Sequence, residues 1–310
     1  MHVLVTGGAG FIGAHSCRVL LEGGHRVTAL DDLSHGRRDA LPAGADLHVL
    51  DVRSPQLAAE LDRLRPDAVL HLAAQMDVRR SVADPMHDAS INVLGTVNVL
   101  AAASRAGASR LVFASSGGAV YGEQQAFPAK EDHPRRPASP YGVSKLCGEE
   151  YVQLAGRDGL STLSLRYANV YGPGQDPLGE AGVVAIFLHK MVHGADPVIN
   201  GDGEQTRDFV FVEDVARANL LAVESREIGA LNVGTGRETS VNALAAMLAR
   251  QVGFARPIAH GPAAAGEQRR SSVDPAAAQR QLGWSPRTSL EDGLRRTARW
   301  FLQRSLPDTP

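Results

Sequence analysis

Short apolar runs alternate with longer amphipathic segments through the first half of the chain. Apolar runs of this length predict strands, and apolar positions at helical spacing predict helices. The predicted strands are 2–6, 26–30, 46–50, 67–73 and 109–115, and the predicted helices are 11–23, 54–64, 84–107 and 139–157. Near-continuous apolar strands separated by helices are typical of a parallel sheet that is covered on both faces. We therefore expect an α/β protein built on a doubly wound parallel sheet.

The pattern loosens after about residue 168. Gly and Pro fill the segment Asn169–Pro177, which is typical of a loop. Shorter strands are then predicted at 197–199 and 208–212, with helices at 213–226, 240–252 and 289–304. No long linker separates the two halves, so we expect a smaller C-terminal lobe that is interleaved with the sheet. The expected division places 1–168 with about 206–235 in the sheet domain, and 169–205 with 236–310 in the lobe.

Composition excludes several classes of protein. The 310 residues are 44% hydrophobic and 21% charged, which is sufficient for a sizeable core, and the formal net charge is −2. Such a charge gives no strong field for nucleic acid or an anionic membrane. The two cysteines, Cys17 and Cys147, supply no disulfide framework. No apolar run approaches the roughly 20 residues of a membrane span. Since the chain opens directly on a strand, we expect a cytoplasmic protein.

A glycine-rich turn follows the first predicted strand. The segment Thr6–Gly13 reads TGGAGFIG, a GxxGxxG variant of the dinucleotide fingerprint of the Rossmann fold. Its glycines allow the backbone to approach a pyrophosphate, which the positive end of the next helix attracts. Asp31 ends the second strand, where a carboxylate binds a ribose diol and repels a 2′-phosphate. This favours NAD over NADP, although Arg37 and Arg38 lie nearby. The glycines alone would equally suit an ordinary tight turn.

Tyr141 and Lys145 are four residues apart, so they share one face of a predicted helix. An ammonium beside a phenol favours the phenolate, and we expect it to lower the pKa of Tyr141 from about 10 towards neutrality. Such a group suits a general base acting on a sugar or alcohol hydroxyl. Ser115 and Ser116 end the fifth strand and could reach the same point. A surface Tyr–Lys pair is the alternative interpretation.

The lysine count favours the functional interpretation. The chain has 32 Lys and Arg residues, of which only Lys130, Lys145 and Lys190 are lysine. Composition bias explains the abundance of arginine. A compact ammonium suits the point beside a tyrosine better than the wide guanidinium fork of arginine does.

The order of these motifs resembles that of the extended short-chain dehydrogenase/reductases, most closely the UDP-glucose 4-epimerases of the short bacterial and archaeal type. The resemblance runs from the first strand to about residue 304. It is carried by GGAGFIG, Asp31-Asp32-Leu33, His71-Leu-Ala-Ala, Asn92-Val-Leu-Gly-Thr, Ser115-Ser-Gly-Gly-Ala-Val-Tyr-Gly, Tyr141-x-x-x-Lys145, Asn169-Val-Tyr-Gly-Pro and Thr206-Arg-Asp-Phe-Val-Phe-Val-Glu-Asp-Val. It implies an NAD-binding Rossmann domain and a lobe that binds a nucleotide sugar.

The resemblance also implies the site residues. For NAD these are Gly7, Gly10, Phe11, Ile12, Gly13, Asp31, Asp32, Leu33, Ser34, Gly36, Asp51, Val52, Leu72, Ala73, Ala74, Asn92, Ser115, Tyr141, Lys145 and Tyr167. For the UDP-sugar they are Ser116, Tyr141, Asn169, Val183, Val198, Asn200, Arg207, Glu267, Arg269 and Ser271. The expected catalytic residues are Tyr141, Lys145, Ser116 and Ser115.

The reaction implied by the resemblance is a transient oxidation. Tyr141 would take the proton of the sugar 4-hydroxyl while the C4 hydride moves to NAD+. Lys145 would hold the cofactor ribose and keep Tyr141 acidic. The 4-keto sugar would then rotate about its diphosphate link and take the hydride back on its other face. The cofactor supplies the redox chemistry and the protein supplies orientation and proton transfer.

The sequence departs from the family at several positions. The hydroxyl that commonly stands three residues before Val-Tyr-Gly is replaced by Gly117, so Ser116, Ser115 or a water molecule must serve instead, and of these we expect Ser116. A common arginine is replaced by Ala264, so we expect one phosphate contact to be missing or moved to Arg269 or Arg270. Ser271 stands where some members place a bulky Tyr, and this predicts space for the N-acetyl group of a UDP-N-acetyl sugar.

Other functions remain open from the sequence alone. A UDP-glucuronate 4-epimerase or decarboxylase is the nearest alternative, and a non-catalytic NAD-binding sensor is an alternative of another class. A 4,6-dehydratase would need an acidic pair where Gly118 and Ala119 stand. His189 and His193 have a metal-chelating spacing but lack an obvious third ligand, so we expect no metal. A homodimer through helices 84–107 and 139–157 is expected, with Trp284 and Trp300 in the core.

Overall fold

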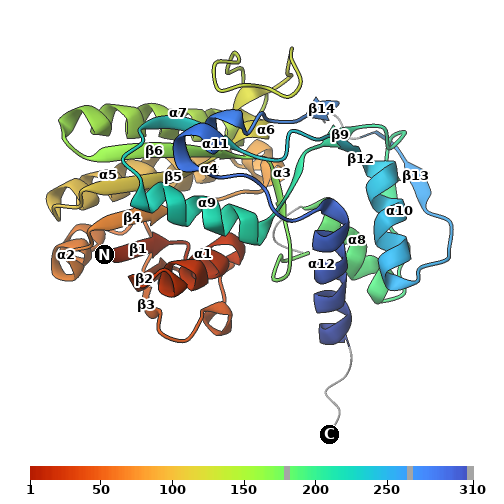
Figure 1. The fold of residues 1–310 in the computed structure, drawn as a ribbon, viewed down its shortest axis with the longest axis horizontal. Coiled ribbons are helices and arrows are strands. Elements are labelled where there is room, and N and C mark those ends of the chain that lie inside the picture. Colours follow the sequence, from red (N-terminus) through yellow and green to blue (C-terminus); the bar gives the residue numbers. More distant parts are fainter. Residues whose placement is uncertain (178–181, 264–267, 306–310) are drawn as a thin grey trace, which may run out of the picture.

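The structure, a computed structural model, describes residues 1–177, 182–263 and 268–305 (Figure 1). Its centre is a seven-stranded parallel sheet in the order β11-β6-β5-β4-β1-β2-β3. The strands are β1 (His2–Thr6), β2 (Arg26–Asp31), β3 (Asp46–Val49), β4 (Ala68–His71), β5 (Arg110–Ser116), β6 (Ser161–Tyr167) and β11 (Gly229–Val233). The predicted doubly wound parallel sheet is thereby confirmed.

Alternate residues of each strand bury themselves against helices on opposite faces of the sheet. Val3 and Val5 pack with α1 (Phe11–Glu22) and α9 (Val212–Glu224). Leu4 instead joins the apolar cluster formed by α2 (Leu57–Leu64), α5 (Thr96–Arg105) and α7 (Pro140–Ala155). Two buried faces explain why the strands are continuously apolar in sequence.

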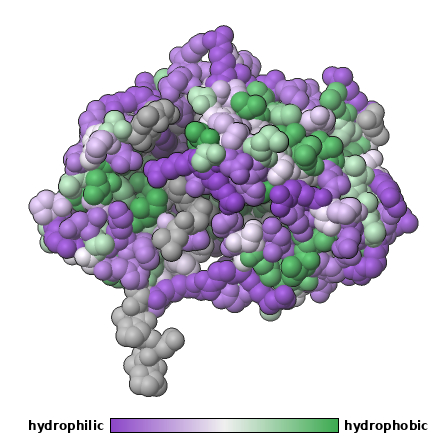
Figure 2. Space-filling model, turned by 180° about the vertical axis from the view of Figure 1, so that it is seen from behind, coloured by the Kyte–Doolittle hydropathy of each residue, from purple (hydrophilic) through white to green (hydrophobic). Residues whose placement is uncertain are grey.

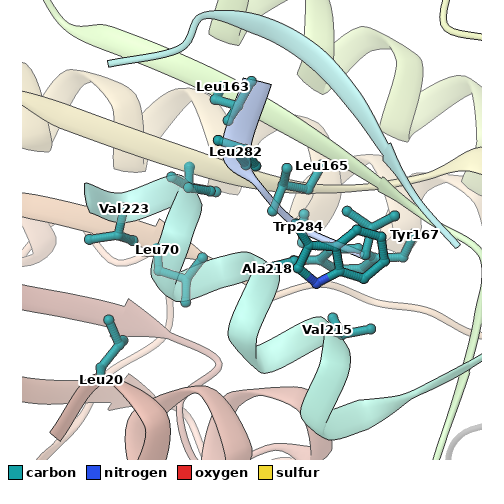
Figure 3. Packing of buried hydrophobic residues seen from close by; sticks show 14 of the residues in the cluster. Leu20, Leu70, Leu163, Leu165, Tyr167, Val215, Ala218, Val223, Leu282 and Trp284 are labelled. Carbon is teal, nitrogen blue, oxygen red and sulfur yellow. The ribbon is translucent and has the colours of Figure 1, made fainter. Parts of the chain in front are cut away.

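The face covered by α9 also holds the buried indole of Trp284. Figure 3 shows this ring against Tyr167 and Leu165 of β6, with Val215 and Ala218 of α9 beside them. Trp284 is completely buried, and its Nε1 donates a hydrogen bond to the Asp214 carbonyl at 2.8 Å. The core position predicted for this residue is confirmed, whereas Trp300 is only partly buried.

The second half of the chain forms a smaller layer beside the sheet, on the right of Figure 1. Its helices are α8 (Val183–Val192), α10 (Val241–Val252) and α12 (Leu290–Ser305), and its strands are β7 (Asn169–Tyr171), β8 (Val198–Asn200), β9 (Thr206–Arg207), β10 (Phe209–Phe211), β12 (Thr239–Ser240), β13 (Ala259–Gly261) and β14 (Arg270–Ser271). The helix α11 (Ala276–Leu282) instead packs on the main sheet, beside β11 and α9. α8, α10 and α12 enclose a separate apolar core.

Several predicted elements need correction. β6 and β11 complete the sheet, although no strand was predicted at either place. The single helix predicted over 84–107 is instead α4 (Pro85–Ala89), a π-helical turn over Ser90–Gly95 and α5. The remaining short helical segments are α3 (Val78–Ala83), α6 (Gly117–Tyr121) and the 3₁₀ turns Arg38–Ala40 and Gly156–Asp158. The π-helical turn lets Asn92 face the sheet, where its side chain is fully engaged in hydrogen bonds.

No helix in the described part of the chain is both long enough and apolar enough to cross a membrane. The face seen in Figure 2 is mostly hydrophilic, with hydrophobic residues gathered in separate patches.

Candidate active site

The glycine-rich turn lies where β1 meets α1, at the carboxyl edge of the sheet. Gly7 has φ +67°, and a Cβ there would lie 2.8 Å from the Ala73 nitrogen. A Cβ on Gly13 would lie 2.0 Å from the Gly7 oxygen. Gly10 precedes α1 with no side-chain cap, so the first N–H groups of this helix are available to an anion. Phe11 and Ile12 begin the helix, with Phe11 buried. This cradle fits a dinucleotide pyrophosphate.

Asp31 is the polar group that faces this cradle. It is buried, and its carboxylate accepts hydrogen bonds from the backbone nitrogens of Ala9 at 3.0 Å and Leu33 at 2.9 Å. Burial raises the pKa of the Asp31 carboxyl, and these hydrogen bonds oppose the effect. A Cβ on Gly36 would collide with the carboxylate, so glycine keeps space around it. The geometry fits recognition of a ribose diol.

The loop after Asp31 is held by local contacts. The Ser34 hydroxyl donates to the Asp32 carboxylate at 2.6 Å. Leu33 has φ +60°, a conformation that bulky residues rarely adopt. Beyond β3, Asp51 pairs with Arg53, and the guanidinium lowers the pKa of the Asp51 carboxyl. Val52 is buried against the position of Gly95.

A buried hydrogen-bond chain fixes the ends of β1 and β4. The Thr6 hydroxyl lies 2.7 Å from Nδ1 of His71, whose Nε2 lies 3.0 Å from the Thr96 hydroxyl. The Thr96 hydroxyl donates to the Asn92 carbonyl, so His71 donates through Nε2 and accepts at Nδ1. Burial and the Lys145 charge lower the pKa of His71 to about 3, which agrees with a neutral ring. These hydrogen bonds also hold the half-buried segment Leu72, Ala73 and Ala74 above the sheet, because the Ala73 nitrogen donates to the Thr6 hydroxyl.

The side-chain amide of Asn92 forms all its hydrogen bonds with other groups of the protein. Its oxygen accepts from the Gln75 nitrogen at 2.9 Å, and its amide donates to the Gln75 carbonyl at 2.8 Å and to Asp88 at 2.9 Å. Asn92 therefore shapes the loop after β4 and offers little to a ligand.

The helix α7 carries Tyr141 and Lys145. Its first turn is stabilised by Pro140 and by the Ser139 hydroxyl, which accepts from the Gly142 nitrogen at 3.2 Å. Lys145 is buried, and its Nζ donates to the Ala114 carbonyl at 3.0 Å. The same Nζ lies 5.9 Å from the centre of the Tyr141 ring. The structure thus brings the two predicted residues together at the end of β5.

The predicted lowering of the Tyr141 pKa is wrong for the protein without ligands. Burial of the phenol and the negative charge of Asp88 raise its pKa, and a hydrogen bond with Ser116 acts in the opposite direction. Burial also lowers the pKa of Lys145 to about 8, while Asp88 and Glu149 oppose this effect. Desolvation therefore outweighs the attraction between ammonium and phenolate that the sequence suggested.

The two serines at the end of β5 have different surroundings. Ser115 is buried and donates a hydrogen bond to the Glu149 carboxylate. Ser116 is half-buried, and its hydroxyl accepts from the Ala119 nitrogen at 3.3 Å, so it can still donate. The geometry favours Ser116 as the hydroxyl beside Tyr141.

The glycines after Ser116 have a packing reason. A Cβ on Gly117 would lie 2.7 Å from Cγ1 of Val273, so a larger residue would displace that side chain. A Cβ on Gly118 would lie 3.3 Å from the Ser271 hydroxyl. Ser271, expected near the sugar, therefore lies against the segment that follows the strand-end serines.

The C-terminal layer reaches the same region through paired short strands. Arg207 on β9 is opposite Ser271 on β14. Next to Arg207, the buried Asp208 carboxylate accepts from the hydroxyl and nitrogen of Thr235 and from the Gly236 nitrogen. This clamp fixes β9 against the loop that follows β11. The Arg207 guanidinium donates to the Thr206 carbonyl at 2.7 Å.

The other predicted substrate residues are more dispersed. Asn169 begins β7 and is exposed, and Val183 begins α8. Val198 begins and Asn200 ends the short strand β8, which pairs with β13. Arg269 is bound by Asp202 through two hydrogen bonds of 2.7 and 2.9 Å on the surface.

Three positions complete the comparison with the sequence. Glu267 and Ala264 lie outside the described residues. Tyr167 lies at the carboxyl end of β6, but its hydroxyl donates to Asn219 of α9 at 2.6 Å and its ring belongs to the core (Figure 3). Its side chain therefore faces away from the Tyr141–Lys145 pair.

Asp88 and Glu149 are residues that the sequence analysis missed. Both are buried, and their charges raise the pKa of Lys145. No local pattern marks either carboxylate, because Asp88 follows His87 and Glu149 precedes Glu150 among mixed polar and apolar neighbours. Among the described residues, no group of three or more His, Cys, Asp and Glu side chains could hold a metal ion.

Comparisons with known proteins agree with this geometry. A family model described as "NAD dependent epimerase/dehydratase family" matches residues 3–234. A protein from Mycolicibacterium smegmatis named UDP-glucose 4-epimerase is 43% identical over 312 residues, covering 98% of this chain and 100% of the relative.

Solved structures of similar proteins are also known. That of a UDP-glucose 4-epimerase from Thermotoga maritima with UDP-glucose has a TM-score of 0.94 at 42% identity, covering 98% of this chain and 99% of the other. That of a UDP-glucose 4-epimerase from Thermus thermophilus in complex with NAD has a TM-score of 0.93 at 41% identity, covering 97% and 99%.

Proposed function

The chain belongs to the NAD dependent epimerase/dehydratase family, and we propose that it is an NAD-dependent UDP-glucose 4-epimerase. The observation that carries the proposal is the pair of half-buried Tyr141 and buried Lys145 at the end of β5, beside the Ser116 hydroxyl and on the same sheet edge as the glycine-rich turn. NAD-dependent oxidation of an alcohol needs such a base close to the cofactor site.

The two layers would bind different ligands, the cofactor and the substrate. We propose that 1–168 with about 206–235 bind NAD, through the turn around Gly7 and the carboxylate of Asp31. The layer of 169–205 with 236–310 would bind the UDP-sugar, with Arg207 on a phosphate oxygen because its guanidinium forms forked hydrogen bonds. The clamp at Asp208 supports this role because it fixes the strand that carries Arg207.

Proton transfer at the sugar 4-hydroxyl is the task of Tyr141. When bound, NAD+ supplies the hydride acceptor and a positive charge at the sheet edge. Ser116 would hydrogen bond to the sugar oxygen, and Tyr141 would take its proton and later return it. A phenolate in this buried position needs the Lys145 ammonium, so the pair must act together.

Small side chains at and around Ser271 leave space on the side of the site that would hold the sugar. The Ser271 hydroxyl lies next to Gly118, and neither residue fills space with a large side chain. We propose that UDP-N-acetylhexosamines are also accepted. A Ser271→Tyr variant should lose activity on UDP-N-acetylglucosamine more than on UDP-glucose. Equal losses on both sugars would contradict this part of the proposal.

The function is tested with purified protein and no added NAD. We expect UDP-glucose to be converted to UDP-galactose, with product identified by chromatography. UDP-glucuronate converted faster than UDP-glucose would favour the uronate epimerase, and no conversion of any UDP-sugar by protein that carries NAD would favour the non-catalytic sensor. A folded Tyr141→Phe variant with full activity would disprove the role of Tyr141.

We also propose a homodimer formed through the predicted helices 84–107 and 139–157. Exposed apolar side chains gather on these helices and the preceding α3, an arrangement that marks interaction surfaces. They are Val82, Met86, Leu94, Val143 and Leu154, each at least 50% exposed. We propose a cytoplasmic location as well, supported by Cys17 and Cys147, both free thiols.

A further inference from the structure

A buried carboxylate lies beneath the candidate catalytic pair. Asp88, near the end of α4, has no exposed surface. Its Oδ1 accepts from the Gln75 amide and the Asn92 amide, both at 2.9 Å, and its Oδ2 accepts from the Ser144 hydroxyl at 2.6 Å. Three donors on two oxygens suit the ionised carboxylate, which accepts hydrogen bonds only.

This carboxylate differs from the other buried acid near the pair. Glu149 is neutralised by Arg166, whose Nη2 lies 2.7 Å from Oε2 of Glu149. Asp88, by contrast, forms no ion pair with any Lys, Arg or His among residues 1–177, 182–263 and 268–305, and its hydrogen-bond donors are all neutral. No cation therefore contacts Asp88 directly, and in this poorly solvated region its charge acts strongly on the nearby Lys145.

The charge acts on both members of the pair. Asp88 raises the pKa of Tyr141 and raises the pKa of Lys145. It is also joined to their helix, because Ser144 directly precedes Lys145 on α7 and donates to Asp88. No other described acid near the pair has both a direct bond to this turn of α7 and an unpaired charge.

We propose that Asp88 is a positioning residue that fixes the Ser144–Lys145 turn of α7 and supplies the negative charge that keeps Lys145 protonated beside Tyr141. The inference deepens the proposed function, because it assigns the pH range in which the pair works. Without that charge a buried ammonium loses its proton near neutral pH, since burial alone already favours the neutral amine.

Few other titratable groups lie close enough to Asp88 and Lys145 to affect the pKa of Lys145. The charge of Asp88 acts on Tyr141 and Lys145 of α7, and the other titratable groups that interact with Lys145 are Glu149 of α7 and His71 of β4. On α4 itself His87 is half-buried, and Arg79 and Arg80 of α3 are exposed. The π-helical turn carries no ionisable side chain. Glu149 remains paired with Arg166, so, of the two acids that act on Lys145, Asp88 is the one without a directly bound cation among the described residues.

The composition of the chain makes the test direct. Lys130 and Lys190 can be replaced by Arg, and neither belongs to the site. Lys145 is then the sole lysine, and its protonation can be followed by NMR of labelled lysine in the protein as purified, with its NAD content measured. In this background Asp88→Asn removes the charge but keeps the shape, because the Asn amide can donate to Ser144.

We expect Asp88→Asn to lower the pKa of Lys145 by about one unit or more. Ser144→Ala, which keeps the charge and loses one hydrogen bond, should shift it much less. Asp214→Asn, at a buried carboxylate in α9, serves as a control for loss of any buried acid. An unchanged Lys145 pKa in folded Asp88→Asn would overturn the proposal. If that variant does not fold, Asp88→Ser tests the same loss of charge.

The pH dependence of kcat/KM gives a second, independent test of the role of Asp88. An anion raises the pKa of every neighbour, so its removal should move both the acid and the alkaline limb of kcat/KM to lower pH. A purely structural role would lower the rate at all pH values without moving either limb, and that result would contradict the proposal. The NMR titration needs no substrate, so it holds even if the proposed epimerase activity is not found.

Discussion

The hydroxyl of Ser115 donates a hydrogen bond to the carboxylate of Glu149, which lies on the buried face of the active-site helix α7. Glu149 in turn binds Arg166 on the neighbouring strand β6 through both oxygens, at 2.9 and 2.7 Å. Ser115 therefore ties β5 to α7 and β6. The adjacent Ser116 is left as the serine that can reach a substrate.

Ser116→Ala should lower kcat strongly while the protein stays folded. A positioned hydroxyl that assists proton transfer typically contributes on the order of 10²-fold to the rate. The measurement is kcat with UDP-glucose together with the thermal midpoint.

Ser115→Ala is the matched control for that variant. It leaves the buried Glu149 short of a donor, which costs about 1–3 kcal/mol of stability and leaves kcat largely unchanged. The reverse pattern, with Ser115→Ala inactive and Ser116→Ala active, would show that the hydroxyls are wrongly assigned.

Ser116 is the serine expected from the sequence, but the structural role of Ser115 could not be predicted from it. Ser115 and Ser116 are equivalent as strand-end hydroxyls, and only the alternation of a strand separates them. The partner of Ser115 lies 34 positions along the chain, on α7. This partner, Glu149, can be buried because Arg166 of β6 neutralises it. A charged residue such as Arg166 is unusual in a central strand. The same charge explains why β6 was not predicted.

Gly7→Ala should abolish NAD binding and destabilise the fold. The new Cβ would lie 2.8 Å from the Ala73 nitrogen, and the φ of +67° is unfavourable for alanine by roughly 1–2 kcal/mol. NAD content of the purified variant and its unfolding midpoint measure the two effects. Gly24→Ala is a control, since Gly24 also has positive φ (+78°) but has no atom within 4 Å of its Cβ. A Gly7→Ala protein that retains NAD would contradict this account of the turn.

The glycine turn itself was predicted correctly from sequence, because local chemistry determines it. Strand, GxxGxxG and helix follow each other within one short segment, and the steric demands of a close turn are local. The π-helical turn over Ser90–Gly95 was not predicted, because it depends on contacts of Asn92 with Gln75 and Asp88. The contact with Gln75, 17 residues away, is not visible in the helical periodicity of the segment.

Asp31→Asn should weaken NAD binding by about 10- to 100-fold, because hydrogen bonds to a charged group contribute about 1.5–3 kcal/mol. It should also reduce the discrimination against NADP, since the repelling charge is lost. Titration calorimetry on protein freed of cofactor measures both affinities.

Asp51→Asn provides the comparison for Asp31→Asn. Asp51 is already paired with Arg53, and we expect a much smaller effect on NAD affinity. Unchanged NAD affinity in Asp31→Asn would remove the ribose contact from the proposed site.

Lys145 should make the stability depend on alkaline pH. Its pKa is about 8 in the folded protein and 10.5 when exposed, so the unfolded chain binds more protons between these values. Stability contributed by this group therefore rises as pH increases from about 8 to 10, by an amount on the order of 3 kcal/mol in total.

Urea unfolding of the protein and of Lys145→Met between pH 7 and 10 measures this effect. The stability of Lys145→Met relative to the parent protein should be greatest at pH 7 and should fall as pH rises, while its epimerase activity is lost. A stability difference that is constant over this range would contradict the lowered pKa.

The proposed dimer can be tested at its apolar face. Met86 and Leu94 are 80% and 64% exposed, and their replacement by Asp should give a monomer in light scattering after gel filtration. Ile228→Asp is the control, because Ile228 is 69% exposed at the amino end of β11. Monomeric parent protein, or a dimer that survives both substitutions, would refute the proposed interface.

The late strand β11 determines how the protein can be divided. The chain leaves the main sheet after β6, forms β7 to β10 and α9, and then returns to pair Gly229–Val233 with Leu163–Tyr167. A fragment that ends before Gly229 would leave β6 as an open edge with unpaired backbone groups. We therefore expect no autonomous N-terminal half: limited proteolysis in the C-terminal layer should leave nicked but associated fragments, and the two layers should unfold in one cooperative transition.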